Sequence, residues 1–529
     1  MELLSAYSME NIRIKLTNMK AIKLFLLPIM MCFIIYIFLT DASAATIVAK
    51  SCSRSDVQAA VNNSSRGDTV AVPACSTTIW PEEVTITKAI SIQGAGIDRT
   101  VIKAGFRAGT GYSSGKWLFR YVPSSPASDQ NVLFEITGFT FNEDSRAGSV
   151  IVRNDKDNTM PLRQVRIHHN KIINSYGVEE TSNEYANSIT IEGVVYGVID
   201  NNTITGVPRV GNFGSSYGTS GKIAWDDTTF EYGSANNMYW EDNTFTKDTI
   251  LIEGNRQCMT YGDRGGRYVF RYNNIINNTT NGFYVWDMHG TQTNGSYANR
   301  STMGAELYGN YISNTKSLMQ VWGHRGGRLI ALNNYVSIGS NGSANAVILD
   351  EAHEYYAPTN HFCPGRTFNG KSYASCASDG MSQEQEKSFM INNRKYPGNT
   401  LLNTEFVKWG NGSLWDGHQI TLNTANASAY NYNTSCTASS CSSGVGCGSA
   451  KPTGTCTVGA GYWQTDQSCS AITDGSYGVN PAKPISGTLY RCTSTNRWEA
   501  FYTPYQYPHP LRTGDTEIVS APKGFKLVN

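Results

Sequence analysis

Hydrophobic and polar residues alternate with a period of two over short stretches of this chain, which is the pattern of β-strands. Residues 84–87 and 90–94 alternate in this way, and turn-forming residues separate the two stretches from their neighbours. Residues 67–73 have the pattern of a turn followed by another short strand. The pattern therefore predicts many short strands joined by turns.

Residues 52–61 have the period of a helix instead. Their hydrophobic side chains, Val57, Ala60 and Val61, fall on one helical face. Ser55 followed three residues later by Gln58 has the spacing of a capping box. We predict a short amphipathic helix that closes one end of a hydrophobic core.

A short motif recurs along the middle of the chain: a strand runs into Asn, then one variable residue, then Ile, Phe or Val. The copies are Asn170-Lys-Ile172, Asn202-Thr-Ile204, Asn243-Thr-Phe245, Asn274-Ile-Ile276, Asn310-Tyr-Ile312 and Asn334-Tyr-Val336. Residues 136–141 fit the same frame, and successive asparagines are 24 to 41 residues apart. A strand-based repeat of this size predicts a solenoid whose coils stack and share a core. Asn in one column suits a tight turn, where its side chain can adopt αL geometry and bond to the Asn of the next coil.

The composition agrees with a β-rich solenoid. The chain has 529 residues, of which 16% are charged and 11% aromatic, and it contains 50 glycines. Few charges together with abundant Gly, Asn, Ser and Thr favour strands and turns over helices. The hydrophobic content of 40% excludes a mainly disordered chain.

Residues 1–44 have the features of a signal peptide. Four basic residues precede an apolar run over residues 24–39, and the small-x-small sequence Ala42-Ser43-Ala44 follows. We predict cleavage after Ala44. The alternative is an uncleaved membrane anchor, but the apolar run is short for a span and contains Pro28.

Cleavage after Ala44 leaves a neutral mature chain. The segment removed contains four of the 43 basic and three of the 42 acidic residues, so 39 of each remain. A neutral chain gives no support for nucleic-acid binding. Recognition by charge would have to be local.

Eleven of the 12 cysteines follow the predicted cleavage site, and disulfides are expected in an exported protein. Cys52 and Cys75 bracket one short segment, and Cys363 and Cys376 bracket another, whereas Cys258 is expected to be a buried free thiol. Six cysteines lie close together, at positions 436, 441, 447, 456, 469 and 492, and the sequence does not choose among their connectivities. The aromatic residues of this region form either a sugar-stacking face or a small core; they are Tyr462, Trp463, Tyr490 and Trp498.

Several segments resemble the pectate-lyase-like right-handed parallel β-helix superfamily. Residues 56–61, 67–70 and 90–94 are similar to its N-terminal cap and first coils. Other segments are similar to bacterial exported β-helix proteins, mostly of unassigned function; they are residues 268–274, 289–292, 306–310 and 487–511. The resemblance implies an all-β fold, a right-handed parallel β-helix solenoid with an N-terminal capping helix and a Cys-rich C-terminal insertion. Since this superfold hosts lyases, hydrolases, adhesins and non-catalytic surface proteins, it does not assign a function.

These observations predict four parts of the chain. Residues 1–44 are the signal peptide and residues 45–428 the β-helix. Residues 429–500 are a disulfide-stapled insertion or subdomain, and residues 501–529 are a C-terminal coil and tail.

Candidate chemistry concentrates in three arginines. Aligned on Asn274 and Asn310, Arg264 and Arg300 each lie ten residues before their asparagine, and Arg325 lies nine residues before Asn334. Equivalent positions of successive coils stack roughly 4.8 Å apart, so these arginines would form a column. A repeated Arg-Gly-Gly-Arg sequence adds a second, partial row, which consists of Arg267 and Arg328.

Like charges this close need carboxylates to neutralise them. One source is the protein itself, in a structural salt-bridge ladder with acids such as Asp263, Glu306, Glu253 or Asp287. The other source is an acidic polysaccharide lying along the helix, since Arg binds carboxylates in a bidentate manner. The sequence leaves both interpretations open.

A lyase for uronate-containing glycans needs a group that neutralises the uronate carboxylate and a base that removes the adjacent proton. Arg264 or Arg300 would neutralise, and His289 or His324 would act as the base. The alternative, favoured over catalysis, is that His289 hydrogen-bonds a turn in a loop. A glycoside hydrolase would instead need two carboxylates that face one sugar bond, such as Asp263 with Asp287, or Glu241 with Asp263.

Calcium is the cofactor that the resemblance suggests, since lyases of this superfold often hold Ca²⁺ between clustered acids. The candidate oxygen ligands are Asp226, Asp227, Glu241 and Asp242, and residues 350–354 form a further acidic cluster. None has the spacing of a recognised binding loop, and solvated turn acids are the alternative. A zinc site at His353 is not supported, because no second His lies at ligand spacing.

Two functions of different classes follow. One is a secreted protein that acts on or binds extracellular polysaccharide, with a lyase favoured over a hydrolase. The other is a non-catalytic structural, adhesion or glycan-binding protein at the cell surface. The expected partner is extracellular polysaccharide, without nucleic acid and without a membrane span after signal cleavage, and the sequence does not predict an oligomeric state.

Overall fold

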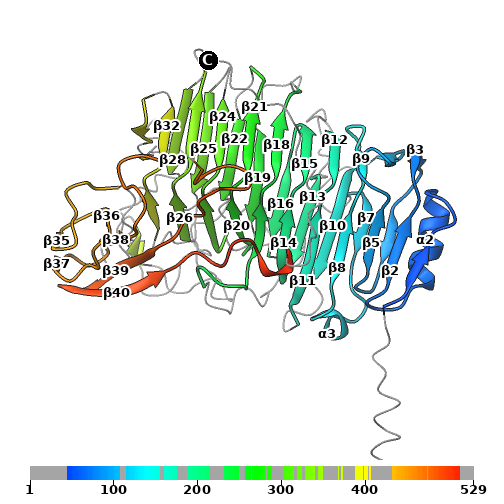
Figure 1. Ribbon diagram of the computed structural model, residues 1–529, viewed down its shortest axis with the longest axis horizontal. Coiled ribbons are helices and arrows are strands. Elements are labelled where there is room, and N and C mark those ends of the chain that lie inside the picture. Colours follow the sequence, from blue (N-terminus) through cyan, green and yellow to red (C-terminus); the bar gives the residue numbers. More distant parts are fainter. Residues whose placement is uncertain are drawn as a thin grey trace, which may run out of the picture. The chain divides into compact units, whose positions relative to one another are not determined.

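A computed structural model describes the chain over residues 44–107, 115–154, 160–175, 187–214, 231–249, 257–263, 265–280, 283–288, 302–314, 318–324, 328–339, 343–348, 367–368, 371–372, 388–396, 398–402, 404–406, 432–472 and 475–512. The chain divides into two units, Met1–Ala45 and Thr46–Asn529. All of the described strands belong to the second unit (Figure 1). The described part contains no helix that is both long and apolar enough to cross a membrane.

Three long sheets make up the body of the second unit, and we name them A, B and C. Sheet A consists of β1 (Thr46–Val48), β2 (Thr69–Val72), β5 (Ser91–Gly94), β8 (Phe134–Thr137), β11 (Leu162–His168), β14 (Val195–Asp200), β17 (Met238–Glu241), β20 (Arg267–Arg271), β23 (Gly304–Tyr308), β26 (Arg328–Leu332) and β31 (Phe389–Ile391). Sheet B consists of β3 (Cys75–Trp80), β6 (Thr100–Ala104), β9 (Thr140–Asn142), β12 (Lys171–Ser175), β15 (Thr203–Gly206), β18 (Thr244–Lys247), β21 (Asn274–Asn277), β24 (Tyr311–Asn314), β27 (Tyr335–Ile338), β32 (Arg394–Tyr396) and β33 (Thr400–Leu401). Sheet C consists of β4 (Val84–Ile86), β7 (Trp117–Tyr121), β10 (Gly148–Asn154), β13 (Ile189–Gly193), β16 (Val210–Phe213), β19 (Gln257–Asp263), β22 (Phe283–Met288), β25 (Leu318–His324), β28 (Ser343–Ile348) and β34 (Thr404–Phe406).

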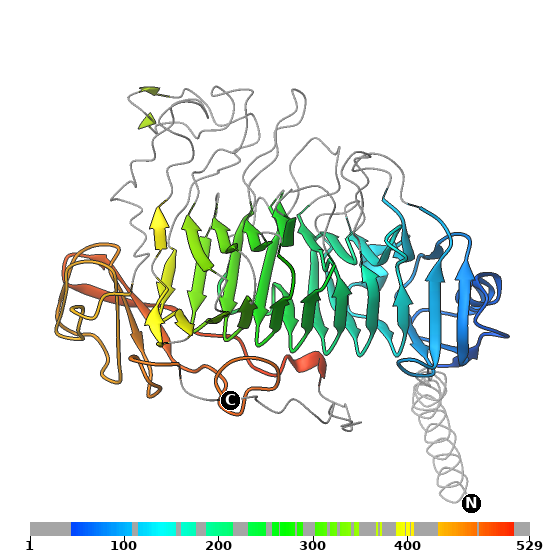
Figure 2. The same ribbon diagram turned by 90° about the horizontal axis from the view of Figure 1, so that it is seen from above.

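Each coil contributes one strand to each sheet, in the order A, B, C, and then returns to sheet A of the next coil (Figure 2). The strands pair in parallel, except that β33 runs antiparallel to β32. Connections of this kind are right-handed in nearly all proteins. The predicted right-handed parallel β-helix is therefore confirmed.

The core lies between the three sheets and is built from stacked columns. One column of sheet A contains, in consecutive coils, Ile136, Ile167, Ile199, Trp240, Phe270, Leu307 and Ala331, all buried. Within it the Trp240 and Phe270 rings stack with their centroids 5.3 Å apart. Because side chains alternate across a strand, the residues between these columns face outward, and their character decides what each outer face can do.

The asparagine motif forms a ladder at the connection from sheet A to sheet B. Its members, all buried, are Asn170, Asn202, Asn243, Asn273, Asn310, Asn334 and Asn393. The backbone N–H and side-chain amide of Asn202 both donate to Oδ1 of Asn243, at 3.0 Å each, and the other coils repeat these bonds. In the coil that contains Asn273 and Asn274, the ladder asparagine is Asn273. The prediction that Asn274 belongs to the ladder is therefore wrong by one residue. Asn274 is instead the first residue of β21 and pairs with Tyr311 of the next coil.

The αL conformation also falls one residue earlier than predicted. The residue before each ladder asparagine has a positive φ, for example Asp242 at 57° and Tyr272 at 57°. This geometry leaves the asparagine itself free to point its side chain along the stack. A bulky residue such as Tyr272 is uncommon there, and its ring contacts Tyr507 and Tyr308.

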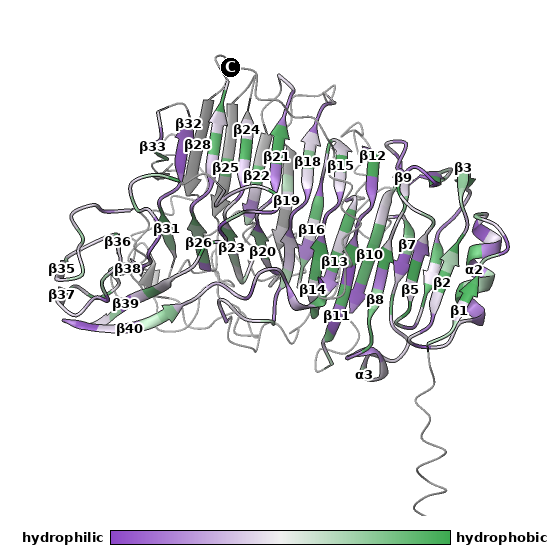
Figure 3. Ribbon diagram, viewed as in Figure 1, coloured by the Kyte–Doolittle hydropathy of each residue, from purple (hydrophilic) through white to green (hydrophobic). Residues whose placement is uncertain are grey.

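Helix α2 (Arg54–Asn63) covers the first coils, as predicted, and shows both hydrophobic and hydrophilic residues (Figure 3). Its cap differs from the prediction, because Ser53 and not Ser55 accepts the hydrogen bond from the Asp56 N–H. Gln58 has another role. Its side-chain amide donates to the Thr85 carbonyl and accepts from the Thr85 N–H, both at 2.9 Å. It thereby takes the place of a neighbouring strand at the free edge of β4.

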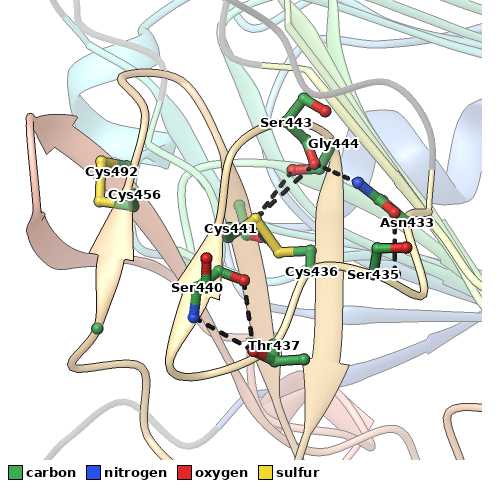
Figure 4. Close-up of a disulfide and its surroundings, with 12 residues drawn as sticks. Asn433, Ser435, Cys436, Thr437, Ser440, Cys441, Ser443, Gly444, Cys456 and Cys492 are labelled. Atoms are coloured by element: carbon green, nitrogen blue, oxygen red, sulfur yellow. Dashed lines mark hydrogen bonds between the residues drawn. A yellow bond between two sulfur atoms is a disulfide. The ribbon is translucent and has the colours of Figure 1, made fainter.

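The Cys-rich region forms a small sheet in the order β36 (Val445–Gly448), β38 (Gly461–Gln464), β39 (Thr488–Ser494) and β40 (Arg497–Tyr502), together with the short pair β35 (Ser440–Cys441) and β37 (Thr455–Cys456). Its six cysteines pair as Cys436–Cys441, Cys447–Cys469 and Cys456–Cys492. Figure 4 shows the first and the last of these disulfides. The expected Cys52–Cys75 disulfide is also present. Cys363 and Cys376 lie outside the described residues.

The aromatic residues of the Cys-rich region divide between core and surface. Trp463 and Tyr462 are buried, and Trp463 belongs to a cluster with Leu332 and Phe389 on the outer face of sheet A. The small-core interpretation therefore holds for Tyr462, which clusters with the cysteines of its own region, whereas Trp463 packs against sheet A. Strand β40 runs to Tyr502, so the sheet extends past the predicted boundary at residue 500.

Residues 503–512 form no further coil. They run back from β40 along the outer face of sheet A to the 3₁₀ helix η4 (Pro510–Arg512), as Figures 1 and 2 show. We call residues 503–512 the strap. Two minor elements complete the described chain, the helix α3 (Pro126–Asp129) and the hairpin of β29 (Thr367–Phe368) and β30 (Lys371–Ser372).

Candidate functional site

The predicted chemistry belongs to one corner of the β-helix, where the chain passes from sheet C to sheet A. Arg264 lies between β19 and β20 in the sequence, Arg300 between β22 and β23, and Arg325 between β25 and β26. These are the same connection in three successive coils. His289 belongs to the same connection as Arg300. All four residues lie outside the described part of the chain, so their contacts stay predictions.

Two predicted acids lie at the ends of the strands that lead into this corner. Tyr261 of β19 pairs with Asp287 of β22, and Asp263 is two residues beyond Tyr261. Strand spacing and rise place the Cα atoms of Asp263 and Asp287 about 8 Å apart. The backbones of Asp263 and Asp287 thus lie in neighbouring coils, as expected. That their carboxylates face one sugar bond stays a prediction.

Asp287 faces outward, because its neighbours Trp286 and Met288 both pack in the core. Its side chain is nevertheless only 3% exposed. Other parts of the protein therefore cover the outer face of sheet C at Asp287. His324 pairs in register with Met288, one position beyond the column of Asp287.

The second arginine row is spaced by a glycine. Arg267 pairs with Gly304, and Gly304 pairs with Arg328, so the two arginines share a column but lie two coils apart. That separation is about 9.6 Å along the stack, which relieves the repulsion expected between adjacent like charges. Arg267 is buried and Arg328 partly exposed.

The predicted calcium ligands Glu241 and Asp242 lie elsewhere, on the outer face of sheet A under the strap. Glu241 contacts Arg271 at 2.5 Å and Arg512 at 2.7 Å, and all three side chains are nearly or fully buried. Asp242 accepts from Arg512, from the Tyr507 hydroxyl and from the Asn480 N–H. Arginine guanidinium groups thus balance the charge of both acids. Asp226 and Asp227 lie outside the described residues.

These contacts form part of a larger buried charge cluster that the sequence analysis missed. It contains three arginines and three acids, namely Arg166, Arg271, Arg512, Asp200, Glu241 and Asp242. The repeated asparagine motif contained a sequence signal that could have predicted this charge cluster. The residue two positions before the ladder asparagine, which faces outward, is charged in several successive coils instead of apolar, as Asp200, Glu241 and Arg271 show.

Burial and charge oppose each other in this cluster. Burial alone would raise the pKa of Glu241, but Arg271 and Arg512 outweigh it and hold that pKa below its ordinary value. Glu306, two strands further along sheet A, has less compensation from positive charges, and burial raises its pKa to about 7. Its Oε1 accepts the Gly233 N–H at 2.7 Å. Burial also lowers the pKa of His509 in the strap to about 4.

A group of three potential metal ligands occurs at the edge of this cluster: His168, His169 and Asp200. The two Nδ1 atoms are 2.7 Å apart, which is a hydrogen bond between the rings, and His168 Nε2 bonds to Glu135 at 2.9 Å. Asp200 accepts two bonds from Arg166 and one from Asn201. Since the carboxylate oxygens of Asp200 already have these donors, the group is a hydrogen-bonded cluster and carries no argument for a metal.

Comparisons with known proteins do not identify a family. No protein-family model matches the chain. No curated protein matches it. A solved structure, Geobacillus virus E2 ORF18, matches at 14% identity over 68% of this chain and 63% of that chain, with a TM-score of 0.28. The chain thus spans less than two thirds of the viral protein, and a likeness this weak carries no argument. The fold is that of a parallel β-helix protein with a disulfide-bonded C-terminal region.

Proposed function

We propose that this protein is a secreted member of the pectate-lyase-like β-helix class that binds an acidic extracellular polysaccharide at the corner between sheets C and A. One observation carries the proposal: Arg264, Arg300 and Arg325 all belong to the same connection in three successive coils. Coils repeat at roughly 4.8 Å, so positively charged groups at this connection would recur along one line. A polymer with regularly spaced carboxylates is a ligand that matches such a line.

The reaction that suits these residues is β-elimination. Arg264, or Arg300 in the next coil, would neutralise the uronate carboxylate and so acidify the proton on the carbon beside it. His289 would take that proton, the bond from the neighbouring carbon to the glycosidic oxygen would break, and a carbon–carbon double bond would form. The departing oxygen would take up a proton, so that charge and atoms balance.

A non-catalytic role is the second candidate, and the burial of Asp287 favours it. An acid that faces outward but is only 3% exposed is what a covered salt-bridge ladder would contain. The four described disulfides and the cap at one end would suit a rigid rod for adhesion. In this case the arginines would be scaffold.

The two candidates are separated by the ultraviolet absorbance of the conjugated double bond that elimination creates. Purified mature protein is incubated with a panel of uronate polysaccharides, with and without Ca²⁺. We expect a rise in absorbance that Arg264→Ala and His289→Ala abolish. Arg497→Ala is the matched control, because Arg497 is exposed and, within the described part of the chain, its ion-pair partner is the exposed Glu499. A flat trace with glycan binding retained would instead assign the non-catalytic role.

A further inference from the structure

The three outer faces of the β-helix differ in what covers them. The strap and the Cys-rich region cover sheet A over the charge cluster. On the outer face of sheet B, every outward position of β15, β18, β21, β24 and β27 is partly or fully exposed, and among the described residues Tyr477 and Gly478 pack against part of this face. We propose that this face of sheet B is a binding surface for an uncharged polysaccharide chain. This inference rests on the proposed function only in that both place the protein among extracellular polysaccharides. The surface and the binding chemistry are different.

The residues of this face follow from the register. Ile204, Phe245, Ile275, Ile312 and Val336 point into the core, so the positions on either side of each point outward. One outward column is Thr203, Thr244, Asn274, Tyr311 and Tyr335. The second is Thr205, Thr246, Ile276, Ser313 and Ser337, which continues to Tyr396. Ten of these 11 residues present a hydroxyl or amide group, repeated at the coil spacing.

Four tyrosines gather at the C-terminal end of the face, and we call them the tyrosine patch: Tyr311, Tyr335, Tyr396 and Tyr477. The Tyr335 ring lies 6.2 Å from Tyr311, 6.0 Å from Tyr396 and 4.8 Å from Tyr477, measured between centroids. Tyr396 is 52% exposed, and the other three are half-buried. Each ring is therefore held by packing on one side while part of it stays accessible to solvent.

Tyr477 comes from the C-terminal region rather than from the coils. Its ring stacks on Tyr311 with a centroid distance of 5.9 Å and an interplanar angle of 28°. The next residue, Gly478, adopts a φ of 74°, and a Cβ there would lie 2.9 Å from Oδ1 of Asn274. The close approach that glycine permits seats this segment beside the column, so the patch exists only when the C-terminal region is docked.

Charge argues for an uncharged ligand. No charged side chain occurs among the outward positions named between Thr203 and Ser337. The cations that flank the face are already engaged: Lys171 pairs with Asp98 at 2.9 Å, and Arg394 donates to the Asn399 carbonyl at 2.6 Å. Because Lys171 is paired with Asp98 and the Arg394 side chain is buried, an anionic polymer would find no exposed, unpaired cation among these residues to offset the loss of its hydration.

The face suits a chain of pyranose rings. The C–H face of a sugar ring is apolar and packs on an aromatic ring, whereas its equatorial hydroxyls need hydrogen-bond partners around the edge. Tyrosine supplies both, since its ring is apolar and its hydroxyl remains polar. The Thr and Ser columns extend the same chemistry along the stack, where strands repeat at roughly 4.8 Å.

The experiment is a sedimentation assay with the purified full mature chain and three insoluble neutral glycans as probes: cellulose, xylan and chitin. We expect the wild-type protein to bind at least one of them, with little change at high salt because no ion pair is involved. Tyr335→Ala and Tyr396→Ala should each weaken binding at least fivefold. Tyr335→Phe keeps the ring and should lose less than Tyr335→Ala.

Matched controls keep the test specific. Tyr490→Ala removes a half-buried tyrosine of the Cys-rich region, which packs near Lys451, and should bind like wild type. Thermal unfolding should show that the exposed Tyr396→Ala variant is folded. Absence of binding to all three probes would overturn the proposal, and so would binding that Tyr335→Ala and Tyr396→Ala leave unchanged.

The same samples separate this inference from the proposed function. Arg264→Ala should leave binding to the neutral probe intact, and Tyr396→Ala should leave activity on uronate glycans intact. Binding to the neutral probe that Arg264→Ala or high salt abolishes would overturn the sheet B site and move the ligand to the arginine corner. If Tyr396→Ala instead dissociates a dimer in sedimentation velocity, the patch is an interface between copies and the proposal is wrong.

Discussion

Removing Arg512 tests whether the buried charge cluster holds the strap in place. The Arg512 side chain is 11% exposed and contacts Glu241, Asp242 and Asp200, whose side chains are 0% exposed. In Arg512→Met the aliphatic stem is kept, but the cluster loses one of its three positive charges. Glu241 keeps Arg271 and Asp200 keeps Arg166, whereas Asp242 keeps no cation among its described partners.

The expected cost follows from that unpaired acid. Breaking one side of a buried ion pair typically destabilises by about 3–5 kcal/mol, because a buried charge is left uncompensated. We expect a loss of this size in the free energy of unfolding, measured by denaturant titration with the disulfides intact. The strap should also become sensitive to protease near Tyr505 and Gln506, whose carbonyls accept from Arg271.

A second substitution checks the cause. Asp242→Asn removes the orphaned charge, so Arg512→Met with Asp242→Asn should recover at least half of the loss. Arg497→Met is the matched control, since its partner Glu499 is exposed and such pairs contribute about 1 kcal/mol or less. A loss of under about 1 kcal/mol in Arg512→Met with an unchanged protease pattern would refute the reasoning.

Three further predictions concern pH, the ladder and the disulfides. The pKa of Glu306 is raised to about 7, so this residue contributes stability at low pH that is lost as the pH rises from the unfolded-state pKa of Glu306 toward 7. The pKa of His509 is lowered to about 4, so this residue contributes stability that is lost as the pH falls from about 6.5 toward 4. These terms oppose each other, so Glu306→Gln should expose a fall in thermal stability on acidification and His509→Gln should expose a rise; identical pH profiles in both variants would contradict this. Asn243→Ala should lower the free energy of unfolding by about 2–4 kcal/mol, since it leaves the buried Asn202 N–H without its acceptor, while Asn274→Ala should cost under about 1 kcal/mol; equal losses would show that the ladder is misassigned. Peptide mapping without reduction should recover Cys447–Cys469, and replacing both residues by Ser should cost about 3 kcal/mol for a loop of 22 residues; a different pairing in the map would refute the connectivity.

The fold class and the stacking of coils are predictable from the repeats along the chain. Identical positions in successive coils become neighbours, so a solenoid must repeat the same residue types down each column, and that repetition is visible without coordinates. Asn202, Asn243, Asn310 and Asn334 were recognised as one column for this reason. The capping helix and the Cys52–Cys75 disulfide were also predictable, because their partners are close in the sequence.

The tertiary structure decided which of two adjacent asparagines enters the ladder. Asn273 and Asn274 fit the motif equally well, but a shift of one residue would turn every side chain of β21 to the opposite face. The core accepts Ile275 and not Ile276. Only the packing of the neighbouring coils chooses between these registers.

The tertiary structure also decided what covers each outer face. Arg271 donates to the Tyr505 and Gln506 carbonyls across 234 and 235 residues, and Arg512 reaches Glu241 across 271. A period of one coil carries no information about contacts at such separations. The physical reason is that coil stacking is a local, repeated interaction, whereas docking of the strap depends on a single match of charge and shape that occurs once in the chain.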